Sequence, residues 1–393
     1  MSIGEQEQSE LKKVFLGIDT SCYTTSVAIM DEAGALLGEA RQILQVKPGR
    51  CGLQQSEMVF QHTRNLPRLM EEAVAQVLGQ TKESANAEQA ACATLENAKQ
   101  EAALEARCAN GGGGLVGLVA AGYELAAIGV SGYPRPLENS YMPAFLAGLS
   151  VARSVAAVTG AKLHVLSHQE NHLEAGLWSA GGPDEDKFLL VHASGGTTDV
   201  LLAERQQNGR YRITEVGGSL DLHAGQFVDR IGVALGLQFP TGPALEALAE
   251  EALKRVEAAS ESEASACAAE KAEIMVELPV SVRKLKVSLS GPCTAALRKL
   301  EAGAEPAALA LGVEHALAET FARVLRNGAQ EYRVRDVLLV GGVGSNKYIR
   351  QHVEKKLAKL RYPVRLWVPE GRYSCDNATG CAAFARRMNM GKR

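Results

Sequence analysis

Two histidines, His168 and His172, lie four residues apart in the segment SHQENHLEAG. On a helix, side chains with this spacing project from one face, one turn above the other. Two neutral imidazoles placed in this way can hold one divalent metal ion, and an acid from elsewhere in the chain often completes such a site. The alternative interpretation of the spacing is a pair of surface or interface histidines.

Two segments further along the chain place glycines where predicted strands end. They are SGGTTD, which begins at Ser194, and GGVGSN, which ends at Asn346. Glycine lets the backbone approach a ligand closely, and a turn of small residues can present its N–H groups to phosphates. An isolated acid, Asp376, follows in SCDNATG. Together with the histidine pair, these segments predict a nucleotide site that contains a metal, whereas SGG alone is also typical of an ordinary tight turn.

Two other acids also lie near glycine turns. Asp19, at the first predicted hairpin, is the type of acid that can contact a metal or orient a water, and Asp229 is the second. The glycine segments do not form the dinucleotide fingerprint GxGxxG, and the chain has no Walker A motif. The predicted nucleotide site therefore belongs to neither of these common classes.

The chain has 393 residues, 46% hydrophobic and 22% charged, and is long enough for two lobes with separate cores. No apolar run approaches the roughly 20 residues that span a bilayer. The segment MSIGEQEQSELKK is polar and has no signal core. The eight cysteines form no CxxC pair, which is typical of reduced thiols. We therefore expect a cytoplasmic protein without membrane association.

The formal net charge of −3 excludes a global basic field of the kind that nucleic-acid-binding domains carry. Two local basic runs remain candidates for such binding, although runs of this kind are usually solvated faces. The first consists of Arg283, Lys284 and Lys286, and the second of Lys355, Lys356, Lys359 and Arg361.

Hydrophobic patterning predicts alternating strands and helices. Strands are expected at 14–31 and 188–204 (each a strand–turn–strand unit), 125–132, 162–168 and 334–342; helices are expected at 57–79, 142–160, 221–250 with a break at 239–242, 307–331, and after 376. The two strand–turn–strand units have equivalent places in two β-rich halves, which makes an internal duplication plausible.

We expect an N-terminal lobe at 13–182 and a C-terminal lobe at 183–393, with a terminal helix that can pack back on the first lobe. Segments rich in Ala, Glu and Gln or Ser, at about 81–107 and 256–271, read as insertions. Few residues in them are large enough to bury much apolar area, so the first is expected to be a mobile appendage outside the catalytic cleft.

Seven motifs follow one another along residues 14–390: GIDTSC, HQENH, SGGTT, AGQFVDRIGVALGLQFPTGP, SLSGPCTAALR, GGVGSN and CDNA. Their order closely resembles the tRNA N6-threonylcarbamoyladenosine synthase family (TsaD type, formerly called O-sialoglycoprotein endopeptidase). The resemblance implies an α/β chain with the two-lobed fold of actin, Hsp70 and sugar kinases (the ASKHA fold) and a nucleotide cleft between the lobes. It also implies transfer of a threonylcarbamoyl group from threonylcarbamoyl-adenylate to N6 of the adenosine beside the tRNA anticodon.

The family's functional residues carry over by position. The resemblance implies one divalent metal, Fe(II) with Zn(II) or Mn(II) as alternatives, held by His168, His172 and Asp376. It assigns Asp19 and Asp376 as candidate catalytic residues. It also implies nucleotide contacts in two groups: the phosphate-side stretch His192, Ala193, Ser194, Gly195 and Gly196, and the ribose and base contacts Asp229, Gly242 and Asn346. The implied partners are the adenylate or an adenine nucleotide, tRNA, and proteins of the threonylcarbamoylation complex.

The chain departs from the family pattern on the acceptor and acid/base side. Tyr23 and Thr24 stand where the family usually has adjacent acids, and Thr197 replaces the histidine of SGGHT. Cys293 replaces the lysine of an S-G-x-K-T stretch. The segment QQSEMVFQ precedes His62 in place of the family's PELASR, and GYPRP replaces YGPG.

The leading hypothesis is therefore a metal-dependent acyltransferase that modifies tRNA. Two alternatives stay open: a related enzyme with a different carbamoyl or phosphoryl acceptor, and a non-catalytic nucleotide-binding partner of the true synthase. The missing acid at Thr24 favours both alternatives, whereas the complete His168, His172 and Asp376 set disfavours the second. A peptidase function is discounted, because there is no HExxH motif and Glu170 lies at the wrong offset between the histidines.

Overall fold

The structure is a computed structural model that describes residues 11–21, 23–46, 53–79, 114–261 and 275–391. It consists of two compact units: unit 1 comprises Met1–Ala175 and Asp376–Arg393, and unit 2 comprises Gly176–Cys375. The expected boundary was after residue 182. The two units instead divide between Ala175 and Gly176, inside helix α5 (His168–Ala180). The Ala-rich segment 81–107, and the part of the 256–271 segment that follows residue 261, lie outside the described residues.

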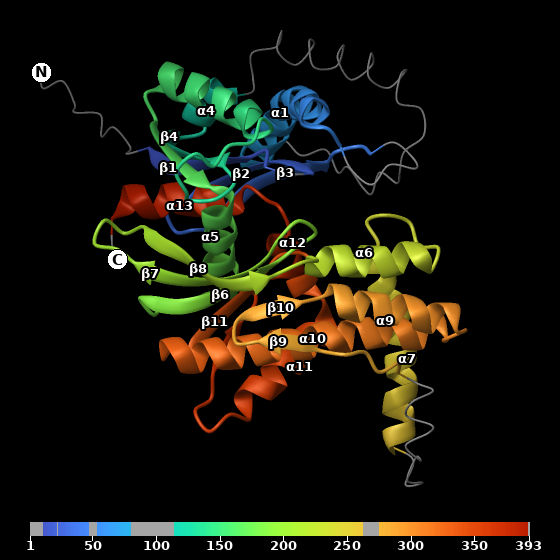
Figure 1. Cartoon of the computed structure of the whole chain (residues 1–393). Helices are drawn as coiled ribbons and strands as arrows, with labels where there is room; N and C mark the ends of the chain where they lie inside the picture. The colour runs from blue at the N-terminus through green and yellow to red at the C-terminus, as the bar shows by residue number, and fades with distance from the viewer. Residues whose placement is uncertain (1–10, 22, 47–52, 80–113, 262–274, 392–393) are drawn as a thin grey trace, which may run out of the picture. The chain divides into compact units, whose positions relative to one another are not determined.

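Unit 1 is built on a five-stranded mixed sheet with the order β3-β2-β1-β4-β5. β1, β2 and β3 form an antiparallel meander, and β4 and β5 continue parallel to β1 (Figure 1). The bounds are β1 (Lys12–Asp19), β2 (Thr24–Asp31), β3 (Leu36–Ile43), β4 (Tyr123–Tyr133) and β5 (Lys162–Ser167). All of them confirm predicted strands except β3, which was not predicted.

Helices cover both faces of this sheet. α1 (Gln55–Val77) and α4 (Phe145–Thr159) pack on one face, with the short α3 (Gly114–Ala120) against α1 and β4, and α13 (Thr379–Met390) packs on the other (Figure 1). Side chains alternate between the two faces along β1. Val14, Leu16 and Ile18 therefore belong to the core beneath α1 and α4, whereas Phe15 packs on the face that α13 covers.

Glycine allows α13 to lie directly against the sheet. A Cβ atom at Gly17 would lie 2.2 Å from the carbonyl oxygen of Ala378, and one at Gly129 would lie 2.0 Å from that of Cys381. These contacts leave no space for a side chain at either strand position. Because side chains alternate along a strand, Asp19 projects from β1 toward the same face as Gly17, which is the face that α13 covers.

Unit 2 contains a seven-stranded sheet with the order β12-β11-β6-β7-β8-β10-β9. β6, β7 and β8 form an antiparallel meander, and β11 and β12 run parallel to β6, so the arrangement of unit 1 occurs a second time. This repeated topology supports the internal duplication. The bounds are β6 (Lys187–Ala193), β7 (Thr198–Arg205), β8 (Tyr211–Ser219), β9 (Ser281–Arg283), β10 (Lys286–Ser288), β11 (Asp336–Val340) and β12 (Arg365–Trp367).

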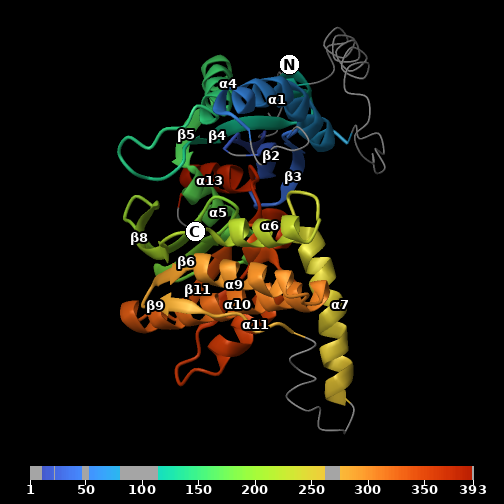
Figure 2. The same cartoon turned by 45° about the vertical axis from the view of Figure 1, so that its right-hand side comes forward.

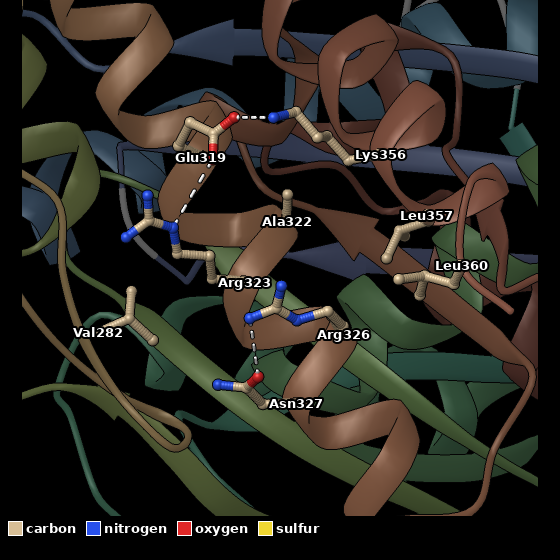
Figure 3. Close-up of a pocket in the computed structure, with 9 residues that line it drawn as sticks. All are labelled: Val282, Glu319, Ala322, Arg323, Arg326, Asn327, Lys356, Leu357 and Leu360. Carbon is tan, nitrogen blue, oxygen red and sulfur yellow. Dashed lines mark hydrogen bonds and ion pairs between the residues drawn. The ribbon is translucent and has the colours of Figure 1, made fainter.

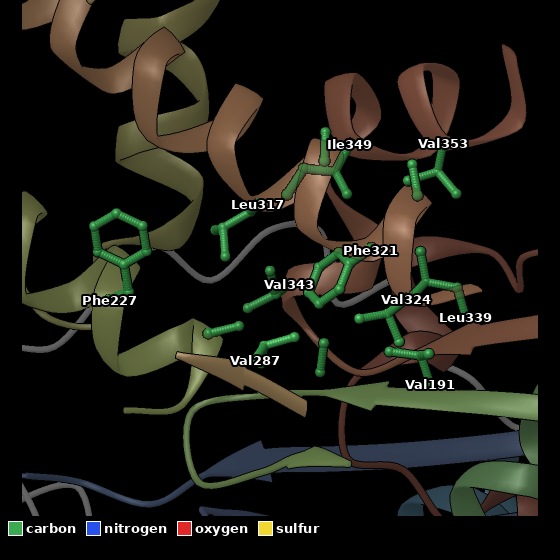
Figure 4. Packing of buried hydrophobic residues seen from close by; sticks show 14 of the residues in the cluster. Val191, Phe227, Val287, Leu317, Phe321, Val324, Leu339, Val343, Ile349 and Val353 are labelled. Atoms are coloured by element: carbon green, nitrogen blue, oxygen red, sulfur yellow. The ribbon is translucent and has the colours of Figure 1, made fainter. Parts of the chain in front are cut away.

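The longest helix of unit 2 is α10 (Pro306–Tyr332), which confirms the helix predicted at 307–331. Pro306 occupies its first turn, and the side chain of Glu305 accepts a hydrogen bond from the N–H of Ala308 (2.7 Å). Phe321, Leu317 and Val324 of α10 pack in the core of the unit (Figure 4).

Unit 2 also has shorter helices, several of which pack against α10 (Figure 2). They are α6 (Ala224–Ala234), α7 (Gly242–Glu261), α9 (Ser290–Glu301), the 3-10 helix η1 (Val343–Ser345), α11 (Lys347–Ala358) and α12 (Gly371–Ser374). The break between α6 and α7 confirms the one predicted at 239–242. Among the described residues, no helix is both long enough and apolar enough to cross a membrane.

Candidate functional site

His168, His172 and Asp376 converge in unit 1. The two Nε2 atoms lie 3.1 Å apart, and Asp376 Oδ1 lies 3.5 Å from Nε2 of His168 and 3.3 Å from that of His172. With metal–ligand bonds of about 2.0–2.2 Å, neighbouring ligand atoms of one tetrahedral or octahedral centre lie about 3–3.5 Å apart. The three donor atoms are therefore spaced for a single ion, and their types suit a first-row divalent metal.

The acid between the histidines is part of the helix start. Glu170 Oε2 accepts hydrogen bonds from the N–H (2.7 Å) and hydroxyl (2.9 Å) of Ser167, and the hydroxyl accepts one from the N–H of Glu170 (3.2 Å). This reciprocal arrangement is a capping box. Glu170 thus fixes the first turn of α5, on which His168 lies.

Close contact between α5 and the start of α13 brings Asp376 to the histidines. The amide of Asn171 donates to the carbonyl oxygen of Asn377 (2.7 Å), and Arg387 pairs with Glu174. A Cβ atom at Gly380 would lie 2.0 Å from the carbonyl oxygen of Asn171, so only glycine fits there without movement of the backbone. The sequence analysis did not single out Asn171, Asn377 and Gly380, although each lies within a quoted motif.

His172 is held in the form that binds metals. Burial, and then the neighbouring His168, lower the pKa of His172, which favours the neutral imidazole. Asp19 is fully buried, and its Oδ1 lies 3.8 Å from Nδ1 of His168, the ring nitrogen that faces away from Asp376. Asp19 therefore lies behind His168, beyond hydrogen-bond distance of its ring, and outside the group of three donor atoms.

The predicted phosphate-side residues lie at one edge of the sheet in unit 2. Because β11 is parallel to β6, the turn after Ala193 and the segment after Val340 leave the same edge. The backbone of Gly341 is in the left-handed region (φ 96°), and a Cβ atom there would lie 2.2 Å from the carbonyl oxygen of Ala193. The structure thus brings the SGG and GGVGSN segments together. His192 is buried one residue before Ala193, within β6.

The hairpin turn exposes its two glycines. The N–H of Ser194 donates to the carbonyl oxygen of Thr197 (2.8 Å), which closes the turn, and the Cβ positions of Gly195 and Gly196 face open space. Among the described backbone hydrogen bonds, none has the N–H of either glycine as its donor. The N–H of Gly225, at the start of α6, donates to Ser194 O (3.1 Å). The glycine amides of the turn are therefore better placed to receive a phosphate than the start of α6.

Asp229 and Gly242 meet where α6 is followed by α7. Asp229 Oδ1 accepts hydrogen bonds from the N–H (2.9 Å) and hydroxyl (3.1 Å) of Thr241, the residue before Gly242. Asp229 therefore holds the start of α7, and its second carboxylate oxygen can also accept a ligand hydroxyl.

Asn346 connects two helices. Its Oδ1 accepts from the N–H of Ile349 (2.9 Å), which caps α11, and its Nδ2 donates to Glu314 Oε1 (2.6 Å) on α10. Burial raises the pKa of Glu314 to about 8, against the effect of the Asn346 hydrogen bond. Glu314 lies within the apolar pattern of α10, so no sequence signal marks it as a site residue.

The residues that depart from the family pattern pack or hydrogen-bond with their neighbours in the structure. Tyr23 packs with Leu44 and Met58 in an apolar cluster, so an apolar contact occupies the place where the family has an acid. His62 is buried, and its Nδ1 shares a hydrogen bond with the hydroxyl of Thr25 (2.9 Å), which connects α1 to β2. Cys293 is also buried, in the core of unit 2, where the family's lysine would carry a charge.

Comparison with known proteins identifies relatives of the chain. The family model of tRNA N6-adenosine threonylcarbamoyltransferase (TsaD) matches residues 141–383. An enzyme of that name from Thermus thermophilus is 27% identical over 378 residues, which are 95% of this chain and 93% of the relative. A probable bifunctional tRNA threonylcarbamoyladenosine biosynthesis protein from Methanothermobacter thermautotrophicus is also 27% identical over 92% of this chain, but the chain spans only 53% of its length.

Similar solved structures include component A of (R)-2-hydroxyglutaryl-CoA dehydratase from Acidaminococcus fermentans and a ROK family glucokinase from Streptomyces griseus. The first is 14% identical with a TM-score of 0.48, and covers 96% of this chain and 99% of its own. The second is 12% identical with a TM-score of 0.43, and covers 95% and 99%.

The repeated meander-plus-parallel topology of the two units defines an α/β protein of the actin, Hsp70 and sugar-kinase class, as predicted. Within that class, the chain belongs to the tRNA N6-adenosine threonylcarbamoyltransferase family, a family of transferases. The family match covers every site residue predicted from the sequence except Asp19.

Replacing Gly380 with alanine tests the contact that places Asp376. Alanine favours helix more than glycine does, so a loss can only come from the clash of its Cβ with Asn171. We expect Gly380→Ala to lower the bound metal, measured by elemental analysis, by at least half. The control is Gly371→Ala, whose Cβ would make an ordinary 3.7 Å contact with Ser345. Equal metal in the two variants would show that the α5–α13 contact does not govern the site.

Two substitutions at Asp229 separate its structural role from nucleotide binding. Asp229→Ala removes the acceptor for Thr241 and should lower the free energy of unfolding by about 1–3 kcal/mol, whereas Asp229→Asn keeps an acceptor oxygen and should cost less. If the carboxylate also accepts ribose hydroxyls, both variants should bind AMP about ten- to a hundredfold more weakly by calorimetry. Wild-type affinity in Asp229→Asn would remove the carboxylate from the nucleotide site.

The raised pKa of Glu314 makes stability depend on pH. Between its ordinary pKa of 4.5 and the folded value of about 8, the folded chain binds a proton that the unfolded chain has lost, so stability falls as pH rises. Relative to the wild type, Glu314→Gln should therefore become more stable as pH rises from 5 to 8.5 in urea unfolding. Glu305→Gln, at the N-cap of the same helix, is the control: the pKa of Glu305 is lowered and its ion-pair partner Arg255 stays charged, so its relative stability should stay constant over this range. A constant difference for Glu314→Gln would contradict the assignment.

Proposed function

We propose that the protein transfers a threonylcarbamoyl group from threonylcarbamoyl-adenylate to N6 of the adenosine next to the tRNA anticodon. The family match and the names of the relatives support the class of reaction. The observation that carries the proposal is the convergence of the three donor atoms of His168, His172 and Asp376 in a chain of this family. A partner without catalytic activity would have no need of this set.

His168, His172 and Asp376 would hold one divalent metal, with Fe(II) favoured by the family resemblance and Zn(II) or Mn(II) also suited to the donors. When bound, the ion supplies positive charge that stabilises the leaving adenylate and polarises the carbamoyl group. The protein's own contribution is to keep His172 neutral by burial and to place the buried carboxylate of Asp19 on the far side of His168, where its negative charge favours a bound cation.

The exposed glycine amides at Gly195 and Gly196 would bind the phosphate of the adenylate, and the carboxylate of Asp229 would orient the ribose. Both contacts fix the substrate before the reaction, so that the amine of the acceptor adenosine meets a positioned carbonyl. Attack by N6 forms the new C–N bond, the bond from the carbonyl carbon to the phosphate oxygen breaks, and AMP leaves with the electron pair as the amine loses a proton.

tRNA, and the other proteins of threonylcarbamoylation in the cytoplasm, are the partners that this function requires. A second candidate function is the same chemistry on a different acceptor. The apolar packing of Tyr23 against Leu44 and Met58 favours it, because an acid that is usual in the family is missing from that place.

The test is incubation of the purified protein with synthetic threonylcarbamoyl-adenylate and unmodified tRNA, followed by digestion of the tRNA to nucleosides. We expect the modified nucleoside from the wild type, and a loss of at least a hundredfold in His172→Ala together with its metal. His315→Gln, which changes a histidine of unit 2 paired with Tyr348, should leave activity within about twofold and serves as the control.

Consumption of the adenylate without a modified nucleoside would point to another acceptor. An unmodified tRNA together with intact adenylate, in the presence of Fe(II), Zn(II) or Mn(II), would rule out the transferase.

A further inference from the structure

The two basic runs of the sequence come together on one surface of unit 2. The first forms the hairpin of β9 and β10, and the second lies along and just after α11. α10 packs against both β9 and α11, and Asn327 of α10 donates a hydrogen bond to the carbonyl oxygen of Lys284 (2.9 Å). Residues about 70 positions apart along the chain thus border the same stretch of α10.

A cavity of about 500 Å³ lies between these elements (Figure 3). Arg323, Arg326 and Lys356 contribute cationic groups to its lining, and Val282, Leu357 and Leu360 form its apolar part. Glu319 is the acid of the lining, and it is already paired with Lys356, Arg323 and His352. Burial raises the pKa of Glu319, but the pairs with Lys356 and His352 outweigh it and hold the pKa at about 2, so the carboxylate stays ionised with its charge balanced by these partners.

Positive charge is concentrated around this cavity. Residues 281–288, 319–333 and 347–361 contain twelve Lys and Arg and three Glu, whereas the whole chain has a formal net charge of −3. We use the term basic surface for Arg283, Lys284, Lys286, Arg323, Arg326, Lys355, Lys356, Lys359 and Arg361, which are all exposed.

Most of these cations form no ion pair with a described acid. In the part of the chain that the structure describes, ion pairs with a carboxylate are recorded for Arg323 and Lys356 but for none of the other seven residues. Like charges held this close repel one another, and an anionic partner relieves that repulsion. The pattern is therefore that of a surface arranged for a polyanion.

The chemistry of the basic surface favours RNA over a membrane. Guanidinium groups in a concave site match phosphate geometry, and cations spread along helices and a hairpin match a row of phosphodiesters. Tyr362 is 65% exposed, and Arg361 lies over its ring at 5.5 Å, so an aromatic face next to the cations can stack on an unpaired base. Leu220, whose N–H donates to the carbonyl oxygen of Val287, is the exposed large aliphatic residue found beside β10 among the described residues, and a single such side chain is too little to anchor a protein in a bilayer.

We propose that the basic surface, formed by the β9–β10 hairpin, the second half of α10 and α11, binds the phosphate backbone of RNA. Only the identity of the RNA as tRNA rests on the proposed function. It places a contact with the RNA in unit 2, whereas the three candidate metal ligands belong to unit 1.

The test measures binding of unmodified tRNA to the full-length protein by fluorescence anisotropy, without adenylate, from 50 to 300 mM NaCl. The variant is Arg326→Gln/Lys359→Gln, which changes two exposed residues that have no recorded acid partner in the described chain. If each contacts a phosphate, the slope of log K against log salt should fall by about 1.5, and affinity at 0.1 M salt should fall about tenfold or more.

The matched control is Arg298→Gln/Lys299→Gln, which removes the same charge from exposed positions at the end of α9, outside the basic surface. It should stay within about threefold of the wild type. Thermal unfolding of both variants checks that they are folded.

Equal losses in variant and control, or no tRNA binding by the wild type at 50 mM salt, would overturn the proposal. It would also be overturned if the variant lost binding to phosphatidylserine vesicles but not to tRNA. The transfer assay is separate: tRNA binding at the basic surface without nucleoside modification would reject the proposed function and leave the RNA-binding surface standing.

Discussion

The candidate metal site depends on how closely α5 and α13 approach each other. Asp376 is distant in sequence from His168 and His172, and it reaches them because the backbone at Gly380 lies directly against that of Asn171. The hydrogen bond from Asn171 to Asn377 and the pair of Arg387 with Glu174 hold the same two segments. On the other side of α13, Gly17 and Gly129 let this helix lie directly against the sheet. Overpacking a contact of this kind typically costs about 1–3 kcal/mol, so these positions tolerate only the smallest residue.

In unit 2, strand pairing rather than helix contact brings the predicted phosphate-side residues together. The parallel pairing of β11 with β6 brings two chain turns to one sheet edge, and Gly341 lets them touch. Asp229 and Asn346 then each fulfil a structural requirement, because one holds the start of α7 and the other caps α11 and meets Glu314. A substitution at either residue therefore changes the fold and the ligand contact together. Conservative replacements that keep one acceptor oxygen are needed to separate the two effects.

Much of this arrangement could be predicted from local sequence. Apolar patterning predicted β1, β2, β4, β5, β6, β7 and β11, as well as nearly all of α10, but it did not predict β3, β8, β9, β10 and β12. The spacing of His168 and His172 predicted their shared helical face. The place of Asp376 followed only from the family's motif order, because no local pattern relates residues on different elements. The contact at Gly380 and the burial of Glu314 were missed for the same reason: both arise from tertiary packing. The convergence of the two basic runs was likewise invisible in sequence, where each run alone is typical of a solvated face.

Metal ligation and polyanion binding make opposite demands on charge. A site built from imidazoles and a carboxylate loses affinity for its ion when cations surround it, because like charges repel most strongly where water is excluded. An RNA surface requires several exposed cations and works through solvent-screened attraction. This chain keeps the two sets in different units, with the candidate ligands in unit 1 and the basic surface in unit 2. Acceptor chemistry and affinity for the RNA backbone can therefore diverge independently within such a fold.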